Sequence, residues 1–426
     1  MLLVKFLRDN KEEAKSGLRK RGFTENDLNL IDEVIDIDDR RKKIQFELDG
    51  VLSNIKSLSA DIGTLYKTGK VPEANSKKAE VATFKTESER LQRDLKMAQD
   101  DLFERLLNIP NIPHNSVPSG TTEEDNEIHR NWTQELPILD ASAKPHWELA
   151  EEFDIIDFPL GVKITGAGFP VFKGKGARLQ RGLINFFLDR ATSAGYLEII
   201  PPLVVNEDSA RGTGQIPDKE GQMYHIEKDE LYLIPTAEVP VTNIYRDVIL
   251  KESDFPIKMT GYTPCFRREA GAYGKDVRGL NRVHQFDKVE IVQIEHPDNS
   301  YDTLMSMLDH VQGLLKELEL PYRILKLCGG DLGSASAITY DFEVYSAAQR
   351  KWLEVSSVSN FETYQSNRLK LRYKGSDQKN HLAHTLNGSA LALARIVAAL
   401  LENNQTSEGI RIPKAIVPYV GFDLLN

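Results

Sequence analysis

The sequence predicts an α+β protein: a domain built on a mostly antiparallel β-sheet, preceded by an antiparallel hairpin of two long helices. Near the N-terminus, apolar residues recur in steps of 3 and 4, the period of a coiled-coil helix. Farther along, short β-rich runs and helical runs follow one another without the regular strand–helix–strand alternation of a parallel sheet. The length of 426 residues suits two or three domains.

Composition excludes several classes of protein. With 40% hydrophobic and 28% charged residues, the chain is neither disordered throughout nor strongly apolar. No stretch approaches the ~18 uncharged apolar residues of a membrane span, and Met1 to Leu7 is too short for a signal-peptide core. The lack of such a stretch predicts no membrane contact. Two cysteines, Cys265 and Cys328, cannot form a disulfide framework, so we expect a reducing cytoplasm. The net charge of −10 disfavours a globally basic nucleic-acid binder but permits a local basic surface.

The N-terminal hairpin is predicted from two apolar heptad runs. The first run consists of Ile44, Leu48, Val51, Ile55, Leu58, Ile62 and Leu65. The second consists of Val81, Phe84, Ser88, Leu91, Leu95, Ala98 and Leu102, with Ser88 as its weakest member. Gly69 and Pro72 interrupt the helical pattern between the runs, so the helices should fold back on each other. Helices of roughly 30 residues would make an arm about 45 Å long.

The arm differs in charge from the rest of the chain. Residues 40–96 contain 13 basic and 8 acidic side chains, a net charge of +5. Two interpretations stay open: a solvated coiled coil of mixed charge, or a surface whose lysines and arginines contact the phosphates of a polyanion. Prolines and polar residues between 108 and 127 indicate a linker, which predicts domains at 1–108 and 109–426.

In the second domain, strands are predicted at 231–234, 288–294 and 323–327, and helices at 179–194, 303–318 and 390–402. Phe266-Arg267-Arg268-Glu269 ends a further strand, and Arg282 to Phe286 begins the next. The loop between them is rich in glycine and charge: Gly271, Tyr273, Gly274, Lys275, Asp276, Arg278 and Gly279. Arginine forks bind phosphate oxygens and Phe286 can stack on a base, which suits a nucleotide. A surface hairpin with salt bridges is the alternative.

The segment Asn387 to Arg395 is expected to open a helix. Small residues at 388, 390, 392 and 394 allow close backbone packing. Arg395 then lies in an apolar helix, where an unpaired guanidinium would be costly. It should therefore face an anionic ligand or, alternatively, an internal carboxylate.

These segments, in this order, resemble the three motifs of class II aminoacyl-tRNA synthetases. The join from Gly195 to Pro202, between a helix and a strand, resembles the first motif. Residues 266–286 resemble the second motif and residues 388–395 the third. Three further segments, 236–238, 266–290 and 354–361, resemble the seryl-tRNA synthetase family, and the helical hairpin resembles its bacterial form. The resemblance extends over essentially the whole chain.

The resemblance implies a serine–tRNA ligase. ATP and L-serine would give seryl-adenylate and diphosphate, and serine would then pass to the 3′ end of tRNA(Ser). Whether tRNA(Sec) is also charged stays open. The implied cofactor is Mg²⁺, the implied assembly a homodimer joined through the first motif, and the implied location the cytoplasm. Residues 1–108 would be the tRNA-binding arm and residues 109–426 the class II catalytic domain.

The resemblance also implies roles for individual residues. Arg267, Glu269 and Arg395 would be catalytic: Arg267 on the α-phosphate and serine carboxylate, Glu269 on the adenine amino group, and Arg395 on the γ-phosphate. ATP would be bound by Arg267, Arg268, Glu269, Val283, Phe286, Glu354, Val355, Ser356, Ser357 and Arg395. Serine would be bound by Thr236, Ala237, Glu238, Arg267, Glu290 and Ser389. Glu354 and Ser357 would hold the metal, since carboxylate and hydroxyl oxygens suit magnesium. For Glu238 and Glu290, structural ion pairing is the alternative.

Rival functions stay open on the sequence alone. A synthetase-like ligase that loads an amino acid on a carrier protein would share the motifs, but such paralogues lack the arm. Threonine or proline synthetases share the motifs without this arm. A coiled-coil scaffold with an inactive catalytic domain would be marked by loss of Arg267 or Arg395, and both are present.

Overall fold

The structure is a computed structural model and describes residues 1–139, 142–218, 221–270 and 278–426. The chain forms two compact units. One comprises Met1–Arg19 and Phe23–Pro110, and the other comprises Lys20–Gly22 and Asn111–Asn426. The division into domains at 1–108 and 109–426 stays a prediction.

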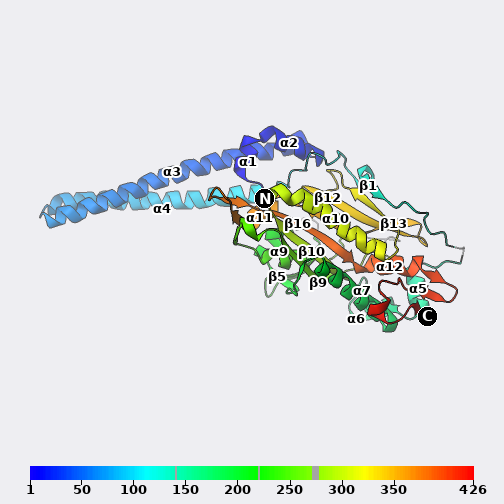
Figure 1. Cartoon of the computed structure of the whole chain (residues 1–426). Coiled ribbons are helices and arrows are strands. Elements are labelled where there is room, and N and C mark those ends of the chain that lie inside the picture. The colour runs from blue at the N-terminus through cyan, green and yellow to red at the C-terminus, as the bar shows by residue number, and fades with distance from the viewer. Residues whose placement is uncertain (140–141, 219–220, 271–277) are drawn as a thin grey trace. The chain divides into compact units, whose positions relative to one another are not determined.

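The first unit is helical. Its elements are α1 (Val4–Asp9), α2 (Lys11–Lys20), α3 (Glu25–Lys67) and α4 (Val71–Leu107), and the two long helices run side by side (Figure 1). A capping box between Thr24 and Asp27 begins α3. At 43 and 37 residues, both helices exceed the expected length. The reason is that apolar burial continues beyond the heptad runs, at Leu28 and Ile31 in α3 and at Leu106 in α4.

The predicted seam is confirmed. Leu48 of α3 packs against Leu91 and Leu95 of α4. Ser88 is buried in the seam, and its hydroxyl donates to the Lys85 carbonyl at 2.9 Å, so this polar group is satisfied within its own helix.

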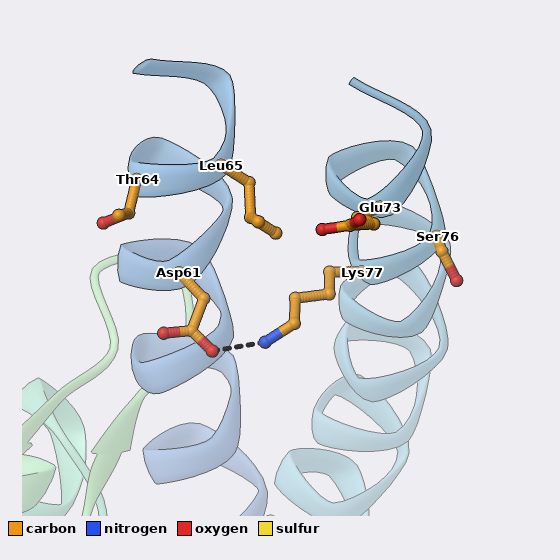
Figure 2. Close-up of a pocket in the computed structure, with 6 residues that line it drawn as sticks. All are labelled: Asp61, Thr64, Leu65, Glu73, Ser76 and Lys77. Carbon is orange, nitrogen blue, oxygen red and sulfur yellow. Dashed lines mark hydrogen bonds and ion pairs between the residues drawn. The ribbon is translucent and has the colours of Figure 1, made fainter. Parts of the chain in front are cut away.

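Near the turn between α3 and α4, the two helices face each other across a pocket of about 460 Å³. Asp61 and Lys77 form an ion pair across it, and Leu65 points toward α4 (Figure 2). The pocket contains none of the residues predicted to act on ATP or serine.

The second unit is built on a sheet whose described part has eight strands in the order β1-β11-β12-β13-β16-β10-β9-β4. Every neighbouring pair is antiparallel except β4 with β9, which confirms the predicted fold class. The strands are β1 (Glu127–Asn131), β4 (Leu197–Glu198), β9 (Ile257–Phe266), β10 (Gln285–Glu295), β11 (Tyr322–Lys326), β12 (Ile338–Ser346), β13 (Lys351–Asn360) and β16 (His384–Ala392).

Helices α7, α10 and α12 share one hydrophobic core with the sheet, because side chains from all three belong to the cluster that contains Val289 and Ile291 of β10. The helices of this unit are α5 (His146–Glu152), α6 (Phe158–Ile164), α7 (Gly174–Ser193), α8 (Glu207–Thr213), α9 (Glu238–Asn243), α10 (Ser300–Glu317), α11 (Thr363–Leu369), α12 (Leu393–Asn403) and α13 (Val417–Val420). In the described residues, no helix has the length and apolarity that a bilayer crossing requires.

Short strands form small sheets around this core. They are β2 (Ile156–Asp157) with β3 (Val171–Phe172); β5 (Val204–Asn206), β6 (His225–Ile226) and β7 (Leu231–Leu233); β8 (Ile249–Lys251), β14 (Arg372–Lys374) and β15 (Asn380–Leu382); and β17 (Gln405–Thr406), β18 (Gly409–Arg411) and β19 (Leu424–Leu425).

The expectation that residues 387–392 open a helix is wrong. They belong to β16, which pairs with both β10 and β13, and the helix begins only at Leu393. The small residues serve strand packing: a Cβ added at Gly388 would lie 3.0 Å from Val358 Cγ2 on β13. The other predicted helices and strands of the second domain are present with shifted ends.

Candidate active site

The predicted site residues lie on the central strands of the sheet. On β10, Glu290 is opposite Gly261 of β9 on one side and Ser389 of β16 on the other. Side chains alternate between the faces of a strand, so residues 286, 288 and 290 share one face while Val289 and Ile291 enter the helix-covered core. The site therefore occupies the sheet face opposite α7, α10 and α12.

A buried, charged cluster forms on this face. The Lys288 ammonium lies 2.5 Å from Glu290 Oε2 and donates to the Thr236 hydroxyl at 2.8 Å. Thr236 donates in turn to Glu290 Oε2 at 3.1 Å. All three residues are at most 5% exposed. Sequence reasoning predicted Thr236 and Glu290 but missed Lys288, although its position midway between Phe286 and Glu290 places it on the same face.

Glu238 is a second buried carboxylate beside this cluster. Its Oε1 accepts from Gln365 Nε2 at 2.6 Å, and its backbone N–H donates to the Thr236 hydroxyl. Burial and the nearby Glu290 carboxylate raise the pKa of Glu238 to about 7. The cluster thus holds two carboxylates but only one ammonium group, a charge balance that favours a ligand with a cationic group. Ala237, between the two predicted polar residues, is buried in an apolar cluster.

Arg267 connects this cluster to Phe286. Its backbone N–H donates to the His284 carbonyl at 2.9 Å, just beyond the end of β9. Its guanidinium carbon lies 5.3 Å from the centre of the Phe286 ring, and its charge acts on Glu238. The backbone N–H of Arg268 donates to the Gln222 carbonyl at 2.8 Å, which holds the chain as it leaves the strand.

Glu269 has a left-handed backbone, with φ of 47°, and its carboxylate accepts from Arg282 Nη1 at 3.2 Å. Val283 is buried in the core beneath this segment. The predicted loop residues Gly271, Tyr273, Gly274, Lys275 and Asp276 lie outside the described residues.

Arg395, in the first turn of α12, faces backbone carbonyls and a carboxylate. Its Nε donates to the Asn281 carbonyl at 2.9 Å and its Nη1 to the Glu354 carbonyl at 2.7 Å. Nη1 also lies 3.8 Å from Glu354 Oε2. The side chain is 26% exposed, so its charge can also reach a ligand.

A β-bulge brings Glu354 and Ser357 together. Pairing between β12 and β13 skips Val355, and the Ser357 hydroxyl lies 3.5 Å from Glu354 Oε1. In a regular strand, residues three apart point to opposite faces. The side chains of Val355 and Ser356 do not join them: Val355 is in the core and Ser356 donates to the Ser389 carbonyl at 2.6 Å.

Asp341 was also missed by sequence reasoning. It pairs in register with Ser357, and burial together with the Glu354 charge raises its pKa well above the ordinary value. Its Oδ1 is buried without a hydrogen-bond partner among the described residues. No sequence motif marked it, because its place beside Glu354 depends on the pairing of β12 with β13.

Known proteins resemble this chain over its whole length. Residues 1–113 match a family model described as "Seryl-tRNA synthetase N-terminal domain", and residues 223–404 match "tRNA synthetase class II core domain (G, H, P, S and T)". A serine–tRNA ligase of Salinibacter ruber is 50% identical over 99% of this chain and 98% of its own length. Another, of Prosthecochloris aestuarii, is 45% identical over 100% of this chain and 99% of its own length.

A solved structure also resembles the whole chain. It is the crystal structure of seryl-tRNA synthetase from Pyrococcus horikoshii complexed with ATP. It superposes with a TM-score of 0.90 at 34% sequence identity, covering 100% of this chain and 99% of that one.

Proposed function

Because this chain belongs to the seryl-tRNA synthetase family, we propose that it is a serine–tRNA ligase that uses ATP. A serine carboxylate oxygen attacks the α-phosphorus of ATP, the bond to the bridging oxygen breaks, and diphosphate leaves. A ribose hydroxyl at the 3′ end of tRNA(Ser) then attacks the acyl carbon of seryl-adenylate, and AMP leaves. The family membership, with the buried cluster of Thr236, Lys288 and Glu290 beside Arg267, carries this proposal.

ATP–pyrophosphate exchange with each amino acid in turn tests the proposal. We expect exchange that depends on serine, followed by charging of a tRNA(Ser) transcript; tRNA(Sec) is the second acceptor to assay. Exchange with another amino acid would contradict serine specificity. The carrier-protein ligase has no support, since the match to the arm domain covers residues 1–113.

For ATP, we assign the α-phosphate and the serine carboxylate to Arg267, whose fork can contact both. Phe286 stacks on the adenine, while Glu269 and the Val283 backbone bind its edge and Arg268 contacts the nucleotide beside them. Arg395 binds the γ-phosphate. The 5.3 Å contact between Arg267 and Phe286 supports this assignment, because it brings a phosphate-binding group next to a base-stacking one.

A magnesium ion fits the donor set of Glu354 and Ser357. Magnesium is usually held by one or two side-chain oxygens together with substrate phosphates. In the described part of the chain, no cluster of three or more His, Cys, Asp or Glu side chains could hold a metal by itself, which agrees with a site that phosphates complete. The ion would neutralise charge on phosphate oxygens. The buried Val355 and Ser356 would support this strand.

For serine, we assign the ammonium group to Glu238 and Thr236 and the hydroxyl group to Glu290 and Ser389, with Ala237 shaping the wall. Lys288 belongs to this pocket as well. Its ammonium forms an ion pair with Glu290 Oε2 at 2.5 Å, and the Glu290 carboxylate can accept a hydrogen bond from the substrate hydroxyl.

The pKa of Glu238 makes serine binding depend on pH. Protonation below about pH 7 removes the negative charge that pairs with the serine ammonium, which itself stays charged. We expect KM for serine to rise as pH falls through 7, by up to about tenfold per pH unit. The measurement is KM for serine in exchange between pH 5.5 and 8, with Glu238→Gln as the control. This variant should bind serine weakly at every pH; a variant profile as steep as that of the wild type would assign the dependence to another group.

For tRNA, we propose that one face of α4 contacts phosphates. Lys78, Lys85 and Arg93 are exposed and recur at intervals of 7 and 8 residues, so they share a helix face, which Glu89 also occupies. In the part of the chain that the structure describes, no ion pair engages these three cations. By contrast, Lys77, Arg90 and Lys96 pair with Asp61, Asp94 and Asp100, respectively.

Replacing Lys78, Lys85 and Arg93 together with alanine should therefore weaken tRNA charging. Each lost phosphate contact lowers the salt dependence of binding by about one unit in the slope of log K against log salt, so we expect a loss of about 2 to 3. Exchange without tRNA should not change. The matched control is the triple variant in which Lys77, Arg90 and Lys96 are replaced by alanine. It removes the same number of positive charges, but from positions that form ion pairs. Equal effects of the two triple variants would contradict a specific phosphate-binding face.

A homodimer and a cytoplasmic location complete the proposal. Two exposed apolar side chains, Leu197 at 63% and Ile200 at 90%, lie at and just after the edge strand β4, within the first motif. An open sheet edge with apolar side chains favours pairing with a second copy.

A further inference from the structure

A buried carboxylate that none of the assigned roles uses lies at the end of α12. Glu402 is fully buried, and four donors surround its carboxylate. The His146 backbone N–H donates at 2.9 Å, His146 Nδ1 at 2.7 Å, Gln349 Nε2 at 2.8 Å, and the Ser346 hydroxyl completes the set. Burial disfavours the charge of Glu402, but the hydrogen bonds from His146 and Ser346 outweigh it and lower the pKa of Glu402. Both oxygens are thus occupied.

The cluster holds the chain that leads into β10. His146 Nε2 accepts from the Leu280 backbone N–H at 2.8 Å, so the ring must carry its proton on Nδ1, where it donates to Glu402. Gln349 Oε1 accepts from Asn281 Nδ2 at 3.0 Å. Leu280 and Asn281 are therefore held by two side chains, and Glu402 binds both of those side chains.

Residues 279–281 pack directly against the His146 imidazole. Gly279 has φ of 68°, and a Cβ added there would lie 2.2 Å from His146 Nε2. The segment also orients Arg395, because the Asn281 carbonyl accepts from Arg395 Nε at 2.9 Å. A continuous path of hydrogen bonds thus runs from Glu402 through Gln349 and Asn281 to the guanidinium.

We propose that Glu402 and His146 are positioning residues for the ATP site: they fix Leu280 and Asn281, and through the Asn281 carbonyl they set the orientation of Arg395. Neither residue touches a substrate. Their effect should reach ATP and spare serine, because the serine cluster on β10 is anchored separately by Thr236 and Lys288. This inference rests on the proposed role of Arg395.

The test is the effect of four variants on the two KM values in exchange. Glu402→Gln keeps the size but replaces the charged oxygen that three N–H donors share with a neutral amide oxygen, so KM for ATP should rise by about tenfold or more. KM for serine should stay within about twofold. His146→Phe and Gln349→Met should raise KM for ATP by about 3- to 10-fold, whereas His146→Gln, whose amide oxygen can accept from Leu280, should retain most of the affinity. Gln349→Met decides the question should Glu402→Gln fail to fold.

Asn403→Ala is the matched control. Asn403 follows Glu402 and bonds Tyr345 and Ala347, in the same region as Ser346 and Gln349, without touching Leu280 or Asn281. It should lower the melting temperature and leave KM for ATP unchanged. An equal rise of both KM values, or an unchanged KM for ATP in Gln349→Met and His146→Phe, would overturn the proposal. Arg395→Ala distinguishes failure of the proposed function from failure of this inference. If Arg395→Ala leaves KM for ATP unchanged, the assigned role of Arg395 is wrong. If Arg395→Ala raises KM for ATP and the Glu402, His146 and Gln349 variants do not, only the positioning inference is wrong.

Discussion

Replacing Arg267 with alanine is expected to reduce serine-dependent ATP–pyrophosphate exchange by about 10²–10³-fold. Negative charge concentrates on the α-phosphate as the carboxylate attacks, and the guanidinium is the preorganised donor we assign to that position. The Arg267 backbone N–H donates to the His284 carbonyl, and the Arg267 guanidinium lies over the Phe286 ring. The side chain is therefore oriented before ATP binds. The measurement is kcat and KM for ATP in exchange.

Arg267→Lys should restore little activity, because an ammonium lacks the planar fork that reaches a phosphate and a carboxylate together. Arg190→Ala is the control: Arg190 lies on α7, on the sheet face opposite the site residues, and forms a partly buried ion pair with Glu317 at 2.7 Å, so its loss should affect stability alone. Near-normal exchange by Arg267→Ala would refute the assigned role.

Replacing Glu290 is expected to change which amino acid is activated. A pocket that hydrogen-bonds the serine hydroxyl leaves its own polar groups unpaired when alanine enters, and such sites reject the analogue by about 10⁴–10⁵. We therefore expect Glu290→Ala to lose most serine activation and to narrow the serine-to-alanine ratio of kcat/KM by several orders of magnitude. Threonine must be excluded by lack of room, so its rejection should be weaker, about 10–200-fold.

The Lys288 ammonium complicates this variant, since Glu290→Ala leaves a buried charge without its partner. The double variant Glu290→Ala with Lys288→Met removes both charges. It should recover stability, while its serine-to-alanine ratio of kcat/KM should stay as small as that of Glu290→Ala. Glu290→Gln keeps the volume and should show an intermediate ratio. A serine-to-alanine ratio that does not change in the stable double variant would mean that another residue reads the hydroxyl.

Fold class and family could be predicted from the sequence because their signals are local. The heptad runs from Ile44 and Val81 predict two helices and their packing, since the period of apolar residues determines which face is buried. The segments around Arg267, Thr236 and Arg395 are contiguous, so their order along the chain indicates the family. Lys288 could also have been found, from its alternation with Phe286 and Glu290.

Three features depend on contacts between segments that are distant in the sequence. Residues 387–392 form a strand because β10 and β13 pair with them, which outweighs their local preference for helix. Glu354 and Ser357 share a face only through a bulge in the pairing with β12. Glu402 and His146 are separated by 256 residues, and neither belongs to a motif.

The sequence by itself thus determined the helical arm, the α+β class, the family and the residues that carry the motifs. Each of these depends on short-range periodicity or on contiguous residues. Only the tertiary structure decided which charges neighbour one another: that Lys288 pairs with Glu290, that burial beside Glu290 raises the pKa of Glu238, and that Glu402 reaches Arg395 through Asn281. The physical reason is that a side chain's partners and its exclusion from water are set by strand register and by packing between distant segments, which no local pattern encodes.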